Sequence, residues 1–156
     1  MMQASNSIRV ERPARFLFEF IVDFGNSPLF DQFGIKVNQV SPGPVGIGTE
    51  YNLVHSSFQR SLRVVEFEKD KTFSITTLEQ SAPRLDLYIQ LVPEGDQLTM
   101  LRLEWKLATG MPGLVERMLA GKITQAVTDG LYDLRELLET GSVRLGNGHE
   151  VHFPKE

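Results

Sequence analysis

One long amphipathic segment near the end of the chain constrains the fold most. Between about Pro112 and Glu139, apolar residues recur at steps of mostly three or four positions: Val115, Leu119, Ile123, Ala126, Val127, Leu131, Leu134 and Leu138. This spacing predicts one long helix with a broad apolar stripe, which needs another apolar surface to cover it. Gly121 and Gly130 each weaken that helix by about 1 kcal/mol relative to alanine. Gly141 predicts its C-terminal cap.

The covering surface is predicted by a series of strand patterns that precedes the helix. Apolar and polar residues alternate in several segments, and short polar turns separate them: 7–11, 37–40, 49–55, 60–68, 72–78, 85–92 and 98–107. Consecutive strands joined by short turns predict an antiparallel meander. One face of such a sheet is covered and the other is solvated.

The segment after the first strand allows two interpretations. Leu17, Phe20, Ile21 and Phe24 fit one helical stripe, but Phe16, Phe18, Phe20 and Val22 fit a strand alternation equally well. Pro13 favours the helix, because proline is well suited to the first position of a helix. Pro28 opens a second short helix, which we expect to reach Phe33.

The order of these elements predicts a single α+β domain over residues 1–141. The chain has 156 residues, of which 41% are hydrophobic and 23% charged, so it can build one core. We expect six to seven strands to curve around the long C-terminal helix, with two short helices after the first strand. This is a helix-grip arrangement, and its closure leaves volume between the sheet and the helix. Residues 142–156 are mostly polar, and we expect them to form a flexible tail.

The charges argue against a nucleic-acid partner. The formal net charge is −4, whereas phosphate binding needs clustered lysine and arginine. Arg60 and Arg63 are close together, but Glu66 and Glu68 follow them, so we interpret this strand as a mixed, solvated face.

The residue types in the chain also argue against a metal site, a cofactor and a membrane span. The chain has no cysteine, which removes disulfides and thiolate ligands. His149 and His152 could share a helical face, but two histidines in a polar tail do not make a metal site, so we predict neither metal nor cofactor. We see no signal peptide and no apolar run long enough to span a bilayer. A cytoplasmic protein is therefore expected.

The colinear order of several short motifs resembles the START-like SRPBCC superfamily, in particular its polyketide cyclase/dehydrase branch. The resemblance covers about residues 8–140 and rests on Ile8-x-Val10-x-x-Pro13, Phe18, Val22-Asp23-Phe24, Asn26, Pro28, Gly46-Ile47-Gly48-Thr49, Val65-Glu66-Phe67-Glu68, Leu91-Val92-Pro93, Gly95, Leu98-Thr99 and Leu134-x-x-Leu137-Leu138-Glu139. The family usually has Thr, Arg and a hydrophobic residue after the hairpin glycine, where this chain has Thr99-Met100-Leu101. The resemblance implies a cavity that binds lipids, polyketides, hormones or quinones, and it implies catalysis only in some members.

A set of apolar and aromatic residues on the expected inner faces could line such a cavity. Trp105 shares one strand face with Leu101, Leu103 and Leu107, and it fits a cavity wall and plain core packing equally well. Methionines at the start of the long helix suit a site that accepts varied ligands, but they fit ordinary gap-filling in a core at least as well. The predicted ligand-binding residues are Tyr51, Leu53, His55, Leu101, Leu103, Trp105, Met111, Leu114, Val115, Met118 and Leu119.

Three polar residues are the candidates for catalysis, should the cavity catalyse a reaction. His55 ends a strand whose inner face also holds Tyr51, so it could orient a carbonyl or act as an acid or base. The alternative is a solvated histidine beside a turn. Glu104 is a third candidate, although its register turns it away from the Trp105 face, and Tyr88 is predicted to face solvent.

These observations predict a binder or carrier of a small hydrophobic molecule, such as a lipid, polyketide or quinone-like compound. One alternative is an enzyme of the polyketide cyclase or dehydratase type, which needs a buried polar group among the apolar walls. A second alternative is a protein-interaction or chaperone-activator module, which needs a filled core and an exposed apolar patch. We expect a monomer or a homodimer.

Overall fold

A computed structural model describes residues 1–23, 30, 33–144 and 150–152 of the chain. Two helices lie in these ranges, and they are α1 (Ala14–Ile21) and α3 (Gly113–Thr140). The described strands are β1 (Met2–Val10), β2 (Lys36–Gln39), β3 (Glu50–His55), β4 (Phe58–Glu68), β5 (Thr72–Thr77), β6 (Arg84–Gly95), β7 (Leu98–Ala108), β8 (Ser142–Arg144) and β9 (Glu150–His152).

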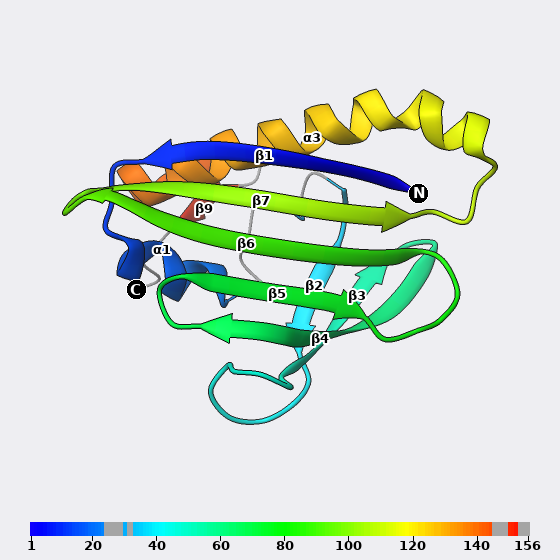
Figure 1. Ribbon diagram of the computed structural model, residues 1–156, viewed down its shortest axis with the longest axis horizontal. Helices are drawn as coiled ribbons and strands as arrows, with labels where there is room; N and C mark the ends of the chain where they lie inside the picture. The colour runs from blue at the N-terminus through cyan, green and yellow to red at the C-terminus, as the bar shows by residue number, and fades with distance from the viewer. Residues whose placement is uncertain (24–29, 31–32, 145–149, 153–156) are drawn as a thin grey trace.

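Seven of these strands form one antiparallel sheet in the order β1-β7-β6-β5-β4-β3-β2. Strands β2 to β7 pair with their neighbours in the chain, as the meander predicts. Strand β1 lies at the edge beside β7, and its register runs from Met2 opposite Leu107 to Val10 opposite Thr99 (Figure 1). The first strand of the chain and the last strand of the meander therefore lie side by side, and β1 also contacts α3.

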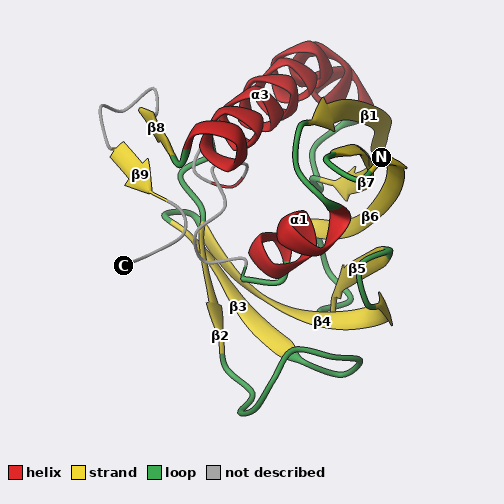
Figure 2. Ribbon diagram, turned by 90° about the vertical axis from the view of Figure 1, so that its left-hand side faces the viewer, coloured by secondary structure: helices red, strands yellow, loops and turns green. Residues whose placement is uncertain are grey.

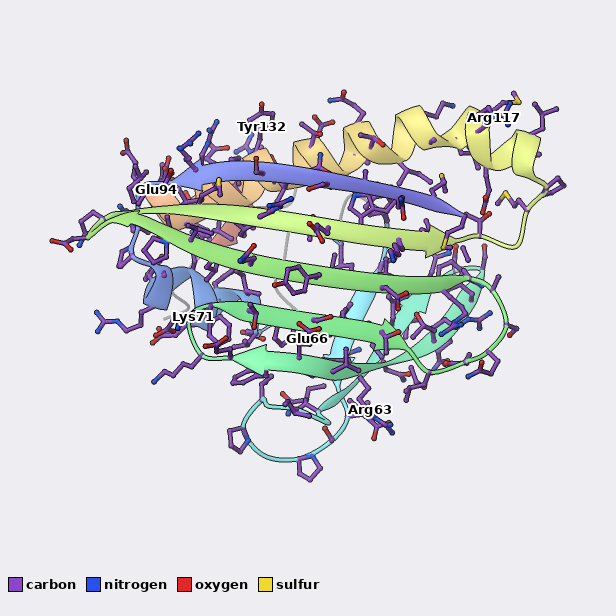
Figure 3. The ribbon with its side chains drawn as sticks, viewed as in Figure 1. Arg63, Glu66, Lys71, Glu94, Arg117 and Tyr132 are labelled. Atoms are coloured by element: carbon purple, nitrogen blue, oxygen red, sulfur yellow. The ribbon has the colours of Figure 1, made fainter. Side chains whose placement is uncertain are left out.

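The sheet curves, and its concave side holds the core. In Figure 2 the strands bend from β1, next to α3, round to β2, and α1 lies inside the curve. Alternate side chains point inward along each strand: on β7, for example, Leu101, Leu103 and Trp105 are buried, whereas Arg102 and Glu104 are exposed. On the outer face, Arg63 and Glu66 project from β4 (Figure 3). The predicted helix-grip architecture is confirmed, and the sheet has seven strands where six to seven were predicted.

The segment that allowed two interpretations forms a helix, α1. Leu17, Phe18, Phe20 and Ile21 are buried, so this short helix supplies aromatic side chains to the core. Pro13, predicted as the first helical residue, is instead the N-cap, one position before the observed start at Ala14, and its carbonyl accepts the first intrahelical bonds from Phe16 and Leu17. The predicted second helix, from Pro28 through Phe33, falls mostly outside the described residues.

Helix α3 begins and ends within one residue of its predicted bounds. Gly141 caps it in the left-handed conformation, with φ at 88°, and its N–H donates to the Leu137 carbonyl at 2.8 Å. Burial along the helix is uneven. Among its apolar residues, Val127, Leu131, Leu134, Leu137 and Leu138 are buried, whereas Leu114, Val115 and Met118 near its start are exposed. In Figure 3 Arg117 and Tyr132 project from α3 away from the sheet.

Part of the segment predicted to be a flexible tail is paired. Strands β8 and β9 form a two-stranded antiparallel sheet in which Ser142 lies opposite His152. Val143 is only 2% exposed, so burial of this apolar residue helps to hold β8 against α3. No described helix is long and apolar enough to cross a membrane.

Candidate functional site

An apolar cavity of about 100 Å³ lies between the sheet and the middle of α3. Strands β6 and β7 form its floor, α3 forms one wall, and the segment before β2 closes it. Its lining consists of Leu85, Leu87, Leu103, Trp105, Leu107, Ile123, Val127, Phe30, Phe33 and Ile35. The only polar side-chain atom in this set is the indole nitrogen of Trp105, so a ligand held here would be held by carbon contacts.

A smaller cavity of about 50 Å³ adjoins the first. Ile35, Leu85 and Leu107 line both cavities, so three aliphatic side chains separate them. The remaining lining residues of the smaller cavity are Leu53, Phe58, Arg60, Thr77 and Pro83. The two volumes therefore meet along a partition that is entirely aliphatic.

A chain of hydrogen bonds positions Trp105 in the wall of the larger cavity. Its indole N–H donates to the Asn6 side-chain carbonyl at 3.3 Å, and the Asn6 amide donates to the Thr128 hydroxyl at 3.3 Å. Thr128 in turn donates to the Thr124 carbonyl within α3 at 3.1 Å. Trp105 is thus linked through Asn6 of β1 to Thr128 of α3, and its indole nitrogen points away from the apolar space.

Some of the predicted ligand-binding residues line the two cavities, and the others lie in the core or on the surface. Leu53 lines the smaller cavity, and Leu103 and Trp105 line the larger one. Leu101 is 1% exposed and lies in the core between its cross-strand neighbours Ile8 and Leu91. The structure thus brings together only part of the predicted set.

The predicted residues at the start of α3 lie away from both cavities. Met111 is 48% exposed, Leu114 is 68% exposed and Met118 is 73% exposed. Val115 is also exposed and Leu119 is half-buried, and neither lines a cavity described here. The first turns of α3 extend beyond the part of the helix that covers the sheet, which a periodic stripe alone does not reveal.

Tyr51 is buried, and its hydroxyl donates to the Val22 carbonyl at 3.2 Å. Burial, together with the negative charge of Asp23, raises the pKa of the Tyr51 phenol to about 12. A phenol with this pKa stays protonated at neutral pH. Its hydroxyl serves to hold the end of α1 rather than to face either cavity.

His55 and Glu104 also lie apart from the two inner cavities. The His55 ring stacks on Phe58 with ring centroids 4.7 Å apart, and its Nδ1 accepts a hydrogen bond from the Ser57 N–H at 3.1 Å. It is therefore a locally bonded histidine beside a turn. Glu104 faces outward as its register predicts, and it pairs with Arg102 at 3.3 Å. Among the described residues, the three catalytic candidates do not converge on one point.

A larger hollow of about 670 Å³ lies on the outer face of the sheet. Most of its lining residues are polar, namely Gln3, Ser5, Glu66, Ser74, Asp86, Tyr88, Glu104 and Lys106, and Ala4, Leu87 and Trp105 complete the lining. Tyr88 thus faces outward as predicted. Several of these groups already have partners, such as Asp86 with Thr76 and Glu104 with Arg102. The outer hollow exceeds the inner cavities in volume, but its side chains are those of an ordinary solvated strand face. The inner cavities have the apolar lining of a ligand site.

Metal ligands do not gather in the described part of the chain. No group of three or more histidine, cysteine, aspartate or glutamate side chains lies close enough to hold an ion there. His149 lies outside the described residues, and His152 pairs with Glu150 at 3.5 Å.

The predicted set omitted most of the cavity lining, on β6 and the segment before β2 as well as on α3 and β4. Ile123 and Val127 belong to the predicted stripe of α3, but nothing in the stripe marks which turn lies over a void. Arg60 was placed on a solvated face with Arg63, and the structure corrects this: Arg60 lines the smaller cavity, whereas Arg63 is exposed on the outer face. The signal was present, because Arg60 is in phase with the buried Leu62 and Val64 on the same strand.

No protein-family model and no curated protein matches the sequence. Solved structures do match its fold. A START superfamily protein from Mycobacterium smegmatis aligns with a TM-score of 0.65 and 17% identity, over 87% of this chain and 98% of that one. The Aha1 dimer from Colwellia psychrerythraea aligns with a TM-score of 0.63 and 14% identity, over 90% of this chain and 98% of that one.

A third structure, DynU16 from the dynemicin biosynthetic locus, aligns with a TM-score of 0.62 and 17% identity. The alignment covers 89% of this chain but only 48% of DynU16. These similarities confirm the START-like fold. At such low identity they carry the fold alone, so the chemistry has to be argued from the cavities of this chain.

Proposed function

We propose that this START-like chain binds a small hydrophobic molecule in the cavity between its sheet and α3. The observation that carries the proposal is the larger cavity itself, whose lining is carbon except for one indole nitrogen that is bonded elsewhere. A cavity of about 150 Å³ lined by Leu, Ile and Phe can hold benzene or xenon. The two adjoining cavities of this chain have a comparable combined size and similar walls.

Apolar contact alone can supply useful affinity at such a site. Each buried CH₂ group contributes about 0.8 kcal/mol, so a group of about six carbons offers several kcal/mol before the cost of association. Lipid, polyketide or quinone-like molecules all contain parts of this kind. The cavity volume favours a small ligand, or one small apolar part of a larger ligand.

Two features favour binding over the alternative functions. A cyclase or dehydratase needs a polar group among the apolar walls. Tyr51, His55 and Glu104 line neither inner cavity, and the polar side chains that do, Arg60 and Thr77, are hydrogen-bonded to backbone carbonyls. An interaction module needs a filled core as well as an exposed apolar patch. Met111, Leu114 and Met118 are exposed at the start of α3, but the space between the sheet and α3 is not filled. DynU16 belongs to a biosynthetic locus and Aha1 forms a dimer, and at this identity neither property passes to this chain.

The single tryptophan provides a direct test, because it lines the larger cavity. We expect benzene to cause a saturable shift of the one indole N–H signal in the NMR spectrum. Val127→Phe places a ring in the cavity and should abolish the shift. Val40→Phe makes the same change at a position that is 59% exposed, and it should behave like the unmodified protein. An unchanged signal at saturating benzene, or an equal shift in Val127→Phe, would contradict the proposal.

A further inference from the structure

Arg60 is the only charged residue among the linings of the two described inner cavities. It lies on β4 opposite Leu53 of β3, and it shares the inward phase of Leu62. The residue is half-buried, as are its cavity neighbours Phe58 and Pro83. A guanidinium therefore stands where the apolar space approaches solvent, at the end of the sheet that holds the β3–β4 turn and the β5–β6 loop.

Hydrogen bonds to the backbone hold this guanidinium in place. Its Nε–H donates to the Pro83 carbonyl at 3.1 Å, one Nη2–H donates to the Ala82 carbonyl at 2.7 Å, and one Nη1–H donates to the Gln59 carbonyl at 2.8 Å. All three acceptors are neutral. Arginine has five N–H donors, so the contacts seen in the described part of the chain leave two N–H groups for another acceptor.

The positive charge of Arg60 has no counter-ion within ion-pair distance among the described residues. The nearby Glu79 carboxylate instead accepts hydrogen bonds from the Ser61 backbone N–H, at 2.5 and 3.0 Å to its two oxygens. His55 lies on the same face but turns its ring onto Phe58. Arg63, three positions further, faces the other side of the sheet and has Glu50 at 3.6 Å. Within the described ranges, Arg60 is thus a fixed cation that pairs with no carboxylate, beside a carbon-lined space.

We infer that the ligand is a small amphipathic anion, whose carboxylate binds Arg60 and whose apolar group fills the cavities. This inference rests on the proposed function, because it names the ligand class of the same site. Arginine pairs with carboxylates through charge-assisted hydrogen bonds, which are stronger than neutral ones. Cavities of about 50 and 100 Å³ set the size of the apolar group at about six carbons. Short-chain and single-ring carboxylates have both features.

The test compares two probes of equal length, hexanoate and 1-hexanol, with the Trp105 indole signal as the readout. We expect hexanoate to bind the unmodified protein about tenfold more tightly than 1-hexanol, because a charge-assisted bond contributes at least this factor. This comparison needs no variant, so it does not depend on the folding of a mutant.

Variants then assign the preference to one residue. Arg60→Gln should remove the preference for hexanoate over 1-hexanol, whereas Arg60→Lys should retain part of it. Arg63→Gln is the matched control, and its preference should equal that of the unmodified protein. Circular dichroism checks that each variant is folded.

The outcomes separate this inference from the proposed function. If 1-hexanol binds as well as hexanoate, or if Arg60→Gln keeps the preference, the carboxylate subsite is wrong and the hydrophobic site stands. If neither probe binds and benzene does not bind either, the proposed function fails and the inference fails with it.

Discussion

At the scale of single residues, Glu116 shows how a polar side chain can be buried on the first turn of a helix. It is the only charged residue that is buried in the described part of the chain, with 6% exposure. One carboxylate oxygen pairs with the Met1 ammonium at 2.6 Å, and the other accepts from the Thr109 N–H at 3.0 Å and the Thr109 hydroxyl at 2.6 Å. The helical periodicity predicts an exposed position here. Burial depends on partners from other parts of the chain, which periodicity does not contain.

These partners give a pH-dependent contribution to stability. The hydrogen bonds from the N-terminus and Thr109 lower the pKa of Glu116 from 4.5 to about 2. A lowered folded-state pKa means that the contribution is fully present above about pH 4.5 and is lost as the pH falls toward 2. We therefore expect Glu116→Gln to destabilise the protein between pH 5 and pH 7, and the difference from the unmodified protein to shrink below about pH 4.5. Urea unfolding at several pH values measures it.

Glu19→Gln is the control for this prediction, because Glu19 is an exposed carboxylate on α1. Its difference in unfolding free energy should stay within about 0.5 kcal/mol. A constant Glu116→Gln difference from pH 7 to pH 3 would contradict the assigned role of the carboxylate.

Thr77 is a second residue whose role depends on a partner elsewhere in the chain. It is 3% exposed, and its hydroxyl accepts from the Leu85 N–H at 2.8 Å and donates to the Leu85 carbonyl at 3.1 Å. Thr77→Val keeps the shape but leaves the Leu85 N–H without this acceptor, so we expect a loss of about 1–3 kcal/mol in urea unfolding. Thr76→Val, on the outer face, should cost much less. Equal effects of the two variants would show that the reciprocal bond to Leu85 is unimportant.

At the scale of elements, the sequence predicted most helix and strand positions because burial on one side imposes a period, but β1 begins at Met2, five residues before the predicted strand, and β8 and β9 were not predicted. The alternation along β7 and the stripe of α3 give their bounds within a residue or two. The same periods do not show how far each residue of a face lies from the core. Val115 belongs to the stripe yet is exposed, and Arg60 belongs to an inward phase yet is charged.

The glycines of α3 allow a test in which the same substitution has opposite effects. Gly141 has φ at 88°, a conformation that side chains with a Cβ disfavour, so Gly141→Ala should lower the unfolding free energy by about 1 kcal/mol. Gly121 lies inside the helix with open space around its Cα, so Gly121→Ala should raise it by about 1 kcal/mol. Chemical denaturation of both variants measures the two signs. A stabilising Gly141→Ala would contradict the cap.

At the scale of the whole molecule, the helix-grip architecture could be predicted because a meander and one long amphipathic helix leave few ways to bury both apolar faces. The position of the cavity could not. It depends on where α3 crosses the sheet and on how the segment containing Phe33 and Ile35 covers the gap. Leu103 and Trp105, two of the predicted residues, line the cavity because β7 runs under that crossing. Met111 and Met118 were not brought there, because the helix extends past it.

Because the cavity lies where sheet, helix and covering segment meet, its ligand should stabilise the fold as a unit. A ligand that binds only the folded state raises the unfolding free energy by about 2.7 kcal/mol at one hundred times its dissociation constant. For a chain of this size, that corresponds to a rise of about 5–10 °C in the unfolding midpoint. We expect benzene to produce this rise in the unmodified protein and in Val40→Phe, as measured by thermal unfolding followed by circular dichroism.

The filled variant Val127→Phe separates binding from a general solvent effect. Its ring occupies the apolar space, so its own midpoint can shift in either direction, but benzene should no longer change it. Benzene in bulk solvent acts on every variant alike, whereas benzene in the cavity acts only where the space is open. A midpoint that rises equally in Val127→Phe and in the unmodified protein would therefore place the ligand outside the space between the sheet and α3.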